Sequence, residues 1–508
     1  MKPSCLKPSL LTGLLVGLLA GSTTAAEPTG SDPVVPPPPI ELTPPPSPVP
    51  ESEPEPSPER EPIRIMLAPM AEPQPALKYR LTYSPLELRS GNAAGVYNKV
   101  AIELERDGAD PEGLSVLWST VPWDEFPRER VRLLLEERAW VMGEIKRAAR
   151  MRSVDWHFPL DERDVFEIRM PEIHPLRSMG DHLATDARLA MVEGRYDDAI
   201  ESLRAGIALG RHVAQSPSII IGLVGRGIAQ SMAHELQNLI QQPGAPNLYW
   251  ALSGLPQPTV EMGESHETEM HLLEVFFPEL AEFRTGSGSA EAAAGIFDHL
   301  SMFVAPLLVE GRSWRQRYSD PAESRAILKA WAEKEDRRAR RELIESGFPA
   351  EEVEAMPLAQ VVILWDYRNH LAVRDDYLKW ILLPAEERRA FRERIDELPR
   401  ALSPETATPL ERFAAKLFIS PGSEFTGALA ADHHIAQLRL FEALRLHAAE
   451  KGGGLPASLD EITVVPVPVD PSTGEPFRYR LEDGIAVVEV SRFPGYRTDQ
   501  RYEIHMAP

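Results

Sequence analysis

The chain has 508 residues, with 54 Lys and Arg against 77 Asp and Glu, which gives a formal net charge of −23 at pH 7. A surface of that sign repels phosphate backbones at long range, so nucleic acid is excluded as an expected partner. The only cysteine is Cys5, so packing without disulfides is expected to stabilise the fold.

Residues 1–26 have the features of a cleavable secretory signal peptide. Lys2 and Lys7 precede an uncharged apolar run at 10–20, and residues 24–26 fit the small-x-small pattern of a cleavage site. The apolar run is shorter than the roughly 20 residues that a membrane-spanning helix needs. We therefore predict cleavage after Ala26 and an exported protein without a transmembrane anchor, which is periplasmic, associated with the cell envelope, or secreted. An uncleaved anchor is the alternative.

Residues 27–75 are predicted to form a disordered linker rich in Pro and Glu. The stretch from Pro28 to Pro75 holds 18 of the 49 prolines in the chain. Proline fixes its own φ and has no amide hydrogen, so such a run favours the extended polyproline II conformation over helix or sheet. The linker is expected to act as a spacer, and binding of a proline-recognising partner is the alternative.

Order is expected to resume near Ala76 with a short strand at 77–83. Its apolar residues Leu77, Tyr79, Leu81 and Tyr83 alternate with polar residues, which is the period of a strand with one buried face. We hypothesise that this strand pairs with strands at the far C-terminus, so that the two ends of the folded region meet.

The region 76–431 is predicted to form one or more helical domains, as an irregular multi-helix bundle or a helical-hairpin array. Apolar residues recur there at helical spacing. Gly222, Gly225 and Gly227 interrupt one apolar helix, and we expect them to let neighbouring helices approach closely. The main predicted helices are 128–151, 176–193, 196–215, 218–241, 322–346 and, leading into the next module, 432–450.

The sequence GRYDDAIESLRAGIALG at 194–210 resembles the turn and second helix of a tetratricopeptide repeat. The helix before it departs from that pattern, because Asp186 stands where the family has a large apolar residue. No second copy lies about 34 residues away, and repeat arrays need three or more copies. The resemblance implies a single helical hairpin. The matching residues are Gly194, Tyr196, Ala199, Leu203 and Gly206.

The last segment, 432–508, is predicted to form a helix followed by a small antiparallel sheet. Strands are expected at 477–481, 485–491 and 502–506. The helix, the phrase GGGLPASLDEI and the loop DPSTGEPFRYR resemble the C-terminal module of type II secretion pseudopilins. In that family the loop region can hold calcium, for which Asp470 and Asp483 are the nearest candidates. Filament assembly is not implied, because no prepilin cleavage site precedes an apolar stem.

The chain as a whole resembles a group of large exported proteins of planctomycete bacteria that have no assigned activity. The resemblance rests on PALKYRLTYSPLELRSGNAAGVYNK at 75–99, on LIQQPGAPNLYWAL at 239–252, and on the two C-terminal phrases above. It implies the architecture and the compartment, and it supplies no catalytic residue.

The search for reactive side chains predicts no catalytic, cofactor-binding or metal site, and no cofactor. In HETEMH, His266 and His271 are five residues apart, whereas two zinc ligands on one helix face need a spacing of four. Asp432, followed by two histidines, is expected to cap its helix. The arginines at 337–341 lie among acidic residues, and the pairs Glu333 with Arg337 and Asp336 with Arg340 have the spacing of a solvated helix face.

These observations favour a non-catalytic protein-interaction or scaffold protein of the cell envelope, whose protein partner is unidentified. The alternative is an enzyme of unrecognised type, with a site assembled from distant helices. Its candidate groups are His174, Asp181, His182 and His212. Asp181 and His182 are adjacent on one predicted helix and face different ways, which weakens that set.

Overall fold

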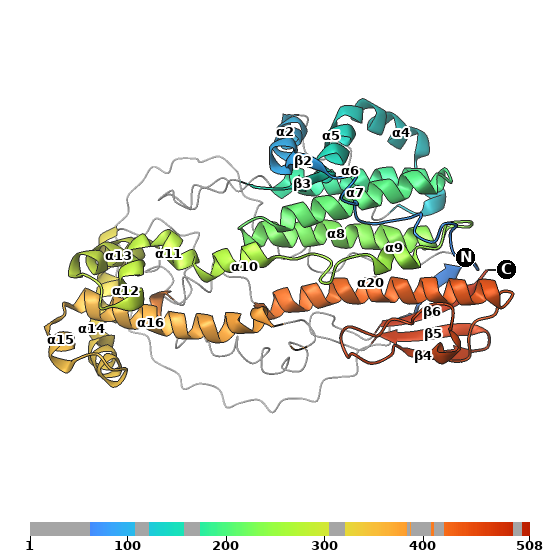
Figure 1. Cartoon of the computed structure of the whole chain (residues 1–508). Helices are drawn as coiled ribbons and strands as arrows, with labels where there is room; N and C mark the ends of the chain where they lie inside the picture. Colours follow the sequence, from blue (N-terminus) through green and yellow to red (C-terminus); the bar gives the residue numbers. More distant parts are fainter. Residues whose placement is uncertain are drawn as a thin grey trace, which may run out of the picture.

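The computed structural model of the protein describes residues 61–106, 121–156, 173–303, 321–383, 387, 408–410, 421–490 and 500–507. These residues form mainly helices, with a small antiparallel sheet at the C-terminal end (Figure 1). This architecture confirms the fold class expected from the sequence. No helix in these ranges combines the length and the apolarity needed to cross a membrane.

The N-terminal half of the described chain builds a layered group of helices. Its elements are β1 (Ile63–Leu67), β2 (Arg89–Asn92), α2 (Ala93–Arg106), the 3-10 helix η1 (Trp123–Glu125), α4 (Arg128–Glu137), α5 (Ala139–Ala149), β3 (Met151–Ser153), α6 (Ile173–Val192), α7 (Tyr196–Ala214), α8 (Ile219–Ile240) and α9 (Tyr249–Ser253). The short strands β2 and β3 pair in parallel beside α2.

The single helix expected over 128–151 is instead two helices, α4 and α5. The chain leaves helical geometry at Arg138, with φ −101° and ψ 21°. The Arg138 guanidinium lies 2.8 Å from Nε2 of His182, and α4 packs on α6 while α5 packs on α2 and α7. No glycine or proline marks this bend, so tertiary packing overrides a continuous helical pattern.

Helices α6, α7 and α8 pack side by side and lie between the layer of α2 and α5 and the helix α20 (Figure 1). At Gly210 and Gly225, α7 and α8 approach each other through their backbones. A β-carbon on Gly210 would lie 2.7 Å from the carbonyl oxygen of Gly225, and one on Gly225 would lie 2.5 Å from the nitrogen of Ala214. The expectation of close approach is therefore confirmed for Gly225. Gly227 faces open space instead, because a β-carbon there would meet nothing within 4 Å.

The C-terminal part consists of a long helix and a four-stranded sheet. It contains α20 (Pro421–Glu450), the 3-10 helix η6 (Leu459–Glu461), β4 (Arg478–Glu482), β5 (Ile485–Val490) and β6 (Gln500–Met506). The strand order is β1-β6-β5-β4, with β4 to β6 antiparallel. Figure 1 shows α20 between the α8–α9 layer and this sheet. The edge-on contact of Phe441 with Tyr502 joins the helix to the sheet.

The two ends of the folded region do meet, but the prediction of a strand at 77–83 is wrong. The strand that pairs with β6 is β1, in parallel, with Ile63 opposite Tyr502 and Leu67 opposite Met506. It falls within 27–75, where a disordered linker was expected, so that expectation is wrong for residues 63–67. Their alternation buries Ile65 and Leu67, although proline-rich sequence surrounds them.

Residues 77–83 form no strand, although their period of two has a structural cause. Leu81 is buried, and the hydroxyl groups of Tyr79 and Tyr83 donate to Asp197 and Glu201 of α7. The segment therefore lies along a helix and uses side-chain hydrogen bonds in place of a sheet ladder. Apolar residues at every second position can contact either a neighbouring strand or a helix, so the pattern alone does not distinguish the two.

The predicted N-cap role of Asp432 is also wrong, because α20 already begins at Pro421. The Asp432 carboxylate instead accepts hydrogen bonds from the backbone nitrogen of Thr259, at 2.9 Å, and from its hydroxyl, at 3.1 Å. The domain boundary expected at 431/432 falls inside this helix.

Two large hydrophobic cores organise the described chain, beside one small cluster of Ala214, Ile219, Ala229, Val260 and Met262. The first core contains buried side chains from Ile65 to Leu255 and from Leu429 to Ile504, so it includes both ends of the folded region. The second core contains side chains from Leu273 to Tyr367, together with Leu410. The helix α10 (Gly263–Met270) connects the first core to the second. The elements of the second core are α11 (Leu272–Phe276), η2 (Pro278–Leu280), α12 (Ala281–Thr285), α13 (Ala290–Phe303), α14 (Pro321–Glu345), α15 (Ala350–Ala355) and α16 (Leu358–Leu378), and η4 (Lys379–Leu382) follows α16.

Candidate functional site

The histidines considered for an enzyme site lie in separate hydrogen-bond networks. His182 is buried in α6, with Nδ1 2.7 Å from the carbonyl oxygen of Ser178 and Nε2 bonded to Arg138. His212 is buried in α7, with Nδ1 3.1 Å from the hydroxyl of Tyr97. Burial and the neighbouring Arg211 lower the pKa of His212 to about 4, so its ring is neutral near pH 7.

The other two members of that set do not complete it. His174 is exposed in the first turn of α6. Asp181 is half-buried, and its backbone carbonyl accepts a hydrogen bond from the hydroxyl of Thr185. These contacts stabilise the helix and leave the four residues in different surroundings.

The two histidines of HETEMH also diverge in the structure. His266 lies within α10, and His271 follows the end of that helix, with Nδ1 3.0 Å from a carboxylate oxygen of Glu274. The structure brings no three His, Cys, Asp or Glu side chains into a metal-binding group anywhere in the described ranges.

Glu274 is the centre of an ionic cluster at the edge of the second core. Its carboxylate accepts hydrogen bonds from the hydroxyl of Tyr367 and, at 2.8 Å, from Arg284. Burial disfavours the charged carboxylate, but the bonds from Tyr367, His271 and Arg284 outweigh it and hold the pKa of Glu274 below its usual range. The cluster joins α11, α12 and α16 and so has a structural role.

Asp470 and Asp483 are not arranged as a calcium site. Asp470 is buried, and one carboxylate oxygen accepts bonds from the backbone and hydroxyl of Ser472 at 2.7 and 2.6 Å, while His433 lies 3.5 Å away. Asp483 adopts a positive φ of 49° in the turn between β4 and β5. The first aspartate thus orders its own loop, and the second shapes a hairpin turn.

A buried ion pair joins the two ends of the first core. Glu442 and Arg445 of α20 are fully buried and 2.9 Å apart. Glu442 also accepts bonds from the side chain of Asn247 at 2.7 Å and the backbone of Leu248 at 2.9 Å, while Arg445 donates to the carbonyl of Ala68 just after β1. Burial raises the pKa of Glu442, and Arg445 opposes that shift. Within the segment LIQQPGAPNLYWAL, Asn247 therefore has a structural role, since its side chain donates a hydrogen bond to Glu442 of α20.

Glu235 in α8 is a buried carboxyl group with a strongly perturbed pKa. Complete burial raises this pKa to about 7, against the effects of Arg188 and Asn238. Arg188 of α6 lies 3.4 Å away and is itself buried. A carboxyl group of this kind can serve as a general base when it faces a cavity, but this one lies in the contact between two helices.

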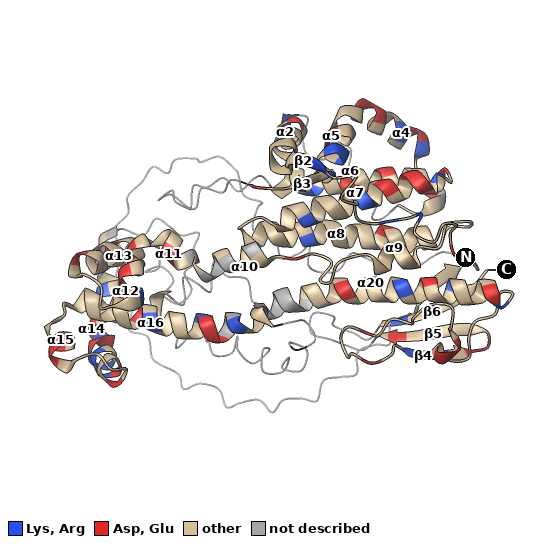
Figure 2. Cartoon of the chain, in the orientation of Figure 1, with Lys and Arg blue, Asp and Glu red and all other residues tan. Residues whose placement is uncertain are grey.

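Charges on the surface are mixed in sign. Figure 2 shows acidic and basic residues interspersed along the helices. In the arginine-rich part of α14, Arg340 lies 2.9 Å from Asp336, as the spacing predicted, whereas Glu333 pairs with Lys329 at 3.8 Å. This helix face is an ion-pair network, but it is only partly solvated, because the Arg340 side chain is 17% exposed and also donates to the carbonyl oxygens of Val353 and Met356.

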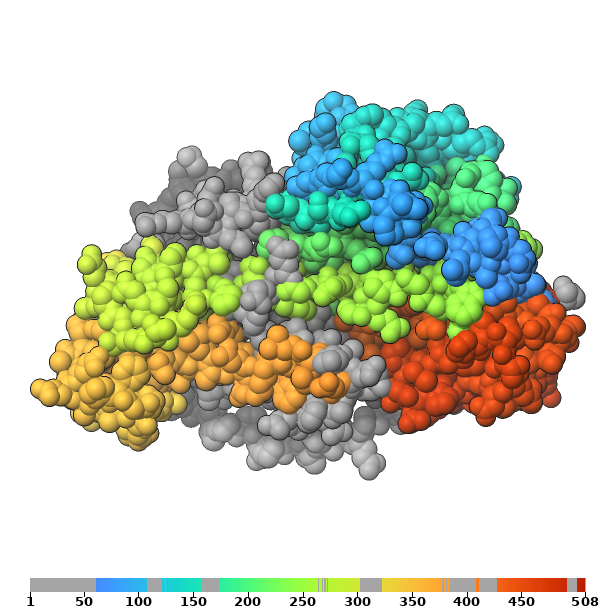
Figure 3. Space-filling view, viewed as in Figure 1, coloured from blue at the N-terminus to red at the C-terminus, as the bar shows by residue number. Residues whose placement is uncertain are grey.

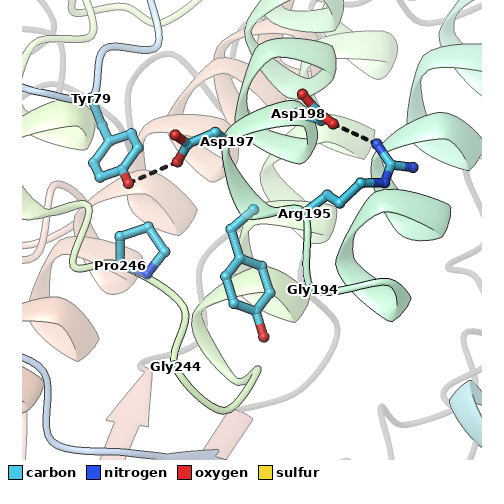
Figure 4. Close-up of a pocket in the computed structure, with 8 residues that line it drawn as sticks. Tyr79, Gly194, Arg195, Asp197, Asp198, Gly244 and Pro246 are labelled. Atoms are coloured by element: carbon cyan, nitrogen blue, oxygen red, sulfur yellow. Dashed lines mark hydrogen bonds and ion pairs between the residues drawn. The ribbon is translucent and has the colours of Figure 1, made fainter.

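The candidate functional site is an open hollow of about 300 Å³ on the surface of the first core (Figure 4). Three segments far apart in the sequence form its walls: residues 77–83, the turn between α6 and α7, and the loop before α9. Its lining residues are Tyr79, Gly194, Arg195, Tyr196, Asp197, Asp198, Gly244 and Pro246.

Hydrogen bonds and ion pairs hold the walls of this hollow in place. The hydroxyl of Tyr79 donates to Asp197 at 2.8 Å, and Nζ of Lys78 lies 3.5 Å from the same carboxylate. Arg195 pairs with Asp198 at 2.5 Å. On the opposite side, the hydroxyl of Tyr196 donates to the carbonyl of Pro243 at 2.6 Å. Both carboxylates in the hollow are therefore already matched by cations of the chain.

Each wall of the hollow belongs to a segment that carries one of the sequence resemblances described above. Tyr79 belongs to PALKYRLTYS, Gly194 to Asp198 belong to the repeat-like GRYDD, and Gly244 and Pro246 belong to LIQQPGAPNLYWAL. Nothing in the sequence indicated that they meet, because Tyr79 is more than a hundred residues from the other two. The helical hairpin of α6 and α7 is confirmed, and it supplies the turn.

Comparisons with known proteins add no relative, since no family model, no curated protein and no solved structure matches the chain.

Proposed function

We propose that the protein is a non-catalytic protein-interaction or scaffold protein of the cell envelope, exported by its signal peptide and without a membrane anchor after cleavage. The observation that carries the proposal is the hollow between Tyr79 and the α6–α7 turn. Its tyrosine rings and glycines form a concave surface that a partner could contact, and its charged groups are already paired. Such a surface suits a peptide segment better than it suits catalysis.

Two large apolar side chains are exposed on or just after the wall segment 77–83, and neither of them lines the hollow itself. Leu77 is 58% exposed and Leu86 is 98% exposed. Burying them against a partner would contribute favourable free energy that the isolated chain does not gain. The paired charges would remain at a polar rim, as in ordinary protein interfaces.

The test is affinity capture of the tagged mature protein from an envelope extract of its own source. We expect stoichiometric partners, and at least tenfold less of them with Leu77→Ser or Leu86→Ser. The matched control is Ile102→Ser, which changes a residue of α2 that is 67% exposed and lies outside residues 77–86. Equal capture by all three variants would contradict the proposal.

The compartment is tested separately on the purified protein. N-terminal sequencing of chain from the periplasmic or secreted fraction should begin at Glu27. A chain that begins at Met1 and sediments with membranes would instead support a retained anchor.

A further inference from the structure

We propose that β4 is a dimerisation edge, at which two copies of this chain pair through their β4 strands in antiparallel orientation. The sheets of the two copies would then form one continuous sheet, with a two-fold axis at Arg480. This surface is separate from the hollow, so the inference does not depend on the proposed function.

The strand β4 lies at the edge of its sheet, and one side of it is open. The strand order β1-β6-β5-β4 gives β4 a neighbour on one side only (Figure 1). The two-residue turn at 483–484 closes on Glu482 and Ile485, so Glu482 and every second residue before it bond to β5. The backbone groups of Tyr479 and Leu481 therefore point away from the sheet. Among the described residues, no backbone hydrogen bond from outside the sheet reaches either of them.

The neighbouring positions of the sheet are already occupied. At the opposite edge, the backbone N–H of Met66 in β1 donates to Oε1 of Gln241, just after α8, at 3.3 Å. Immediately before β4, Pro476 forms a bridge with Val469. The open stretch of the described sheet is therefore β4 itself. An edge of this kind pairs readily with another strand, and one such edge per chain gives a closed pair of chains instead of a fibre.

The sequence of β4, Arg-Tyr-Arg-Leu-Glu, is complementary to its own reverse. When Tyr479 of each copy lies opposite Leu481 of the other, both strands use all of their outward backbone groups. In this register Arg478 faces Glu482 of the partner subunit, so opposite charges meet at both ends of the pair. The tyrosine and leucine form aromatic–aliphatic pairs across the strands, which also stabilise a sheet.

Arg478 is the charged residue of β4 that its own chain leaves free. It is exposed and forms no ion pair with any described residue, whereas Arg480 pairs with both Glu482 and Glu489. The two copies of Arg480 would meet at the two-fold axis, where like charges repel. Their own two carboxylates offset this repulsion, and Arg478 gains a carboxylate that it lacks in the monomer.

The dimer is expected to be weak and to carry two copies of the hollow. A pair of five-residue strands buries less area than a standard protein interface. We therefore expect a monomer at about 1 µM and a dimer above about 100 µM. A partner with two binding segments would be held by both hollows and would dissociate more slowly than a partner with one.

The test is disulfide trapping in the full chain. In a Cys5→Ser background the chain has no other cysteine, so Arg480→Cys places one thiol at the two-fold axis. Directly opposed residues at such a position have Cα atoms about 4.5 Å apart, which a disulfide can join. We expect most of the Arg480→Cys chain to become a covalent dimer on mild oxidation at about 100 µM.

The matched control is Arg478→Cys, which is exposed on the same face of β4. Its two copies would lie about 14 Å apart in the proposed register, too far for a disulfide, so the yield should be at least fivefold lower. Adding Glu482→Cys to this variant should restore the crosslink. Equal yields from Arg480→Cys and Arg478→Cys, or a higher yield from Leu481→Cys or Tyr479→Cys, would overturn the proposed pairing.

A charge swap tests the same pairing without cysteine. Arg478→Glu and Glu482→Arg should each raise the dimer dissociation constant about tenfold, because the two-fold axis makes every substitution count twice. The double variant should return this constant to within about threefold of the original. Sedimentation equilibrium measures the constants, and an unchanged melting temperature shows that each variant is folded. A chain that stays monomeric at about 500 µM, or a double variant as weak as the single ones, would overturn the inference.

Discussion

The first and second cores are both helical, but they are assembled differently. The first core brings β1 beside β6 and ties α20 to the loop before α9 through Glu442 and Arg445, so it depends on contacts between distant parts of the chain. The second core is built almost wholly from residues 273–367. Figure 3 shows the N-terminal segment in blue against the red C-terminal part, in the first core. This difference indicates that a lesion at either end of the chain should weaken the first core and spare the second.

The largest expected effect comes from Glu442→Ala. Removing this carboxylate leaves Arg445 buried without its charge partner, which typically costs about 3–5 kcal/mol of unfolding free energy. Chemical denaturation should show the first core unfolding earlier and the second core unchanged. Glu482→Ala, at an exposed pair with Arg480, is the matched control and should cost less than about 1 kcal/mol. Equal losses in both variants would contradict the importance of the buried pair.

Gly225→Ala should be the next most damaging change. Its β-carbon would collide with the backbone of α7, and relief requires α7 and α8 to separate, at a cost of about 3 kcal/mol. Gly227→Ala, two residues away and facing open space, should stabilise the helix by about 0.5–1 kcal/mol. Thermal unfolding of the two variants compares them directly, and a shift in the same direction for both would refute the close contact.

Acid should weaken both cores through one buried histidine in each. Burial lowers the pKa of His212 in the first core and of His370 in the second core to about 4, against 6.5 in the unfolded chain. Since the folded state binds the proton more weakly, stability is complete above pH 6.5 and falls as the pH drops toward 4. Each histidine accounts for a loss of about 2 kcal/mol between pH 7 and 5.

The measurement for these histidines is denaturation at several pH values with His212→Gln and His370→Gln. Each variant should flatten the pH dependence of its own core only. A flattening of both cores by a single variant would show that the cores unfold together.

The smallest effect is expected at the surface of the second core. Arg338 and Glu342 are partly exposed and 2.8 Å apart on α14, so Arg338→Ala should cost about 0.3–0.5 kcal/mol, and less at high salt. Unfolding at two salt concentrations tests this value. A loss above about 1 kcal/mol that salt does not change would mean that the arginine acts through packing on Trp365.

The elements that the sequence predicted well have strong local signals. Helices α6, α7, α8 and α14 and strands β4 to β6 lie within a few residues of their predicted bounds, because periodicity, glycines and a hairpin turn mark them. The bend at Arg138 and the position of residues 77–83 were missed because a helical or alternating pattern does not say which surface it will meet. The strand β1 was hidden by the prolines around it.

The candidate site was less accessible to sequence reasoning than the fold. Each wall of the hollow belonged to a phrase that had drawn notice, but their meeting depends on how α6, α7 and the loop before α9 are packed. The histidines that seemed reactive are engaged in helix and loop contacts instead. Reactive residue types alone therefore did not indicate the hollow.

The parallel pairing of β1 with β6 also has a mechanical consequence. The tail enters at the Ile63 end of this pair, and β6 runs out at its opposite end, with five residue pairs in register between them. Tension between the two ends of the chain would therefore load these pairs together in shear, instead of opening them one after another. A chain tethered by its tail and pulled from its C-terminal end would resist force in the direction in which two paired strands are strongest.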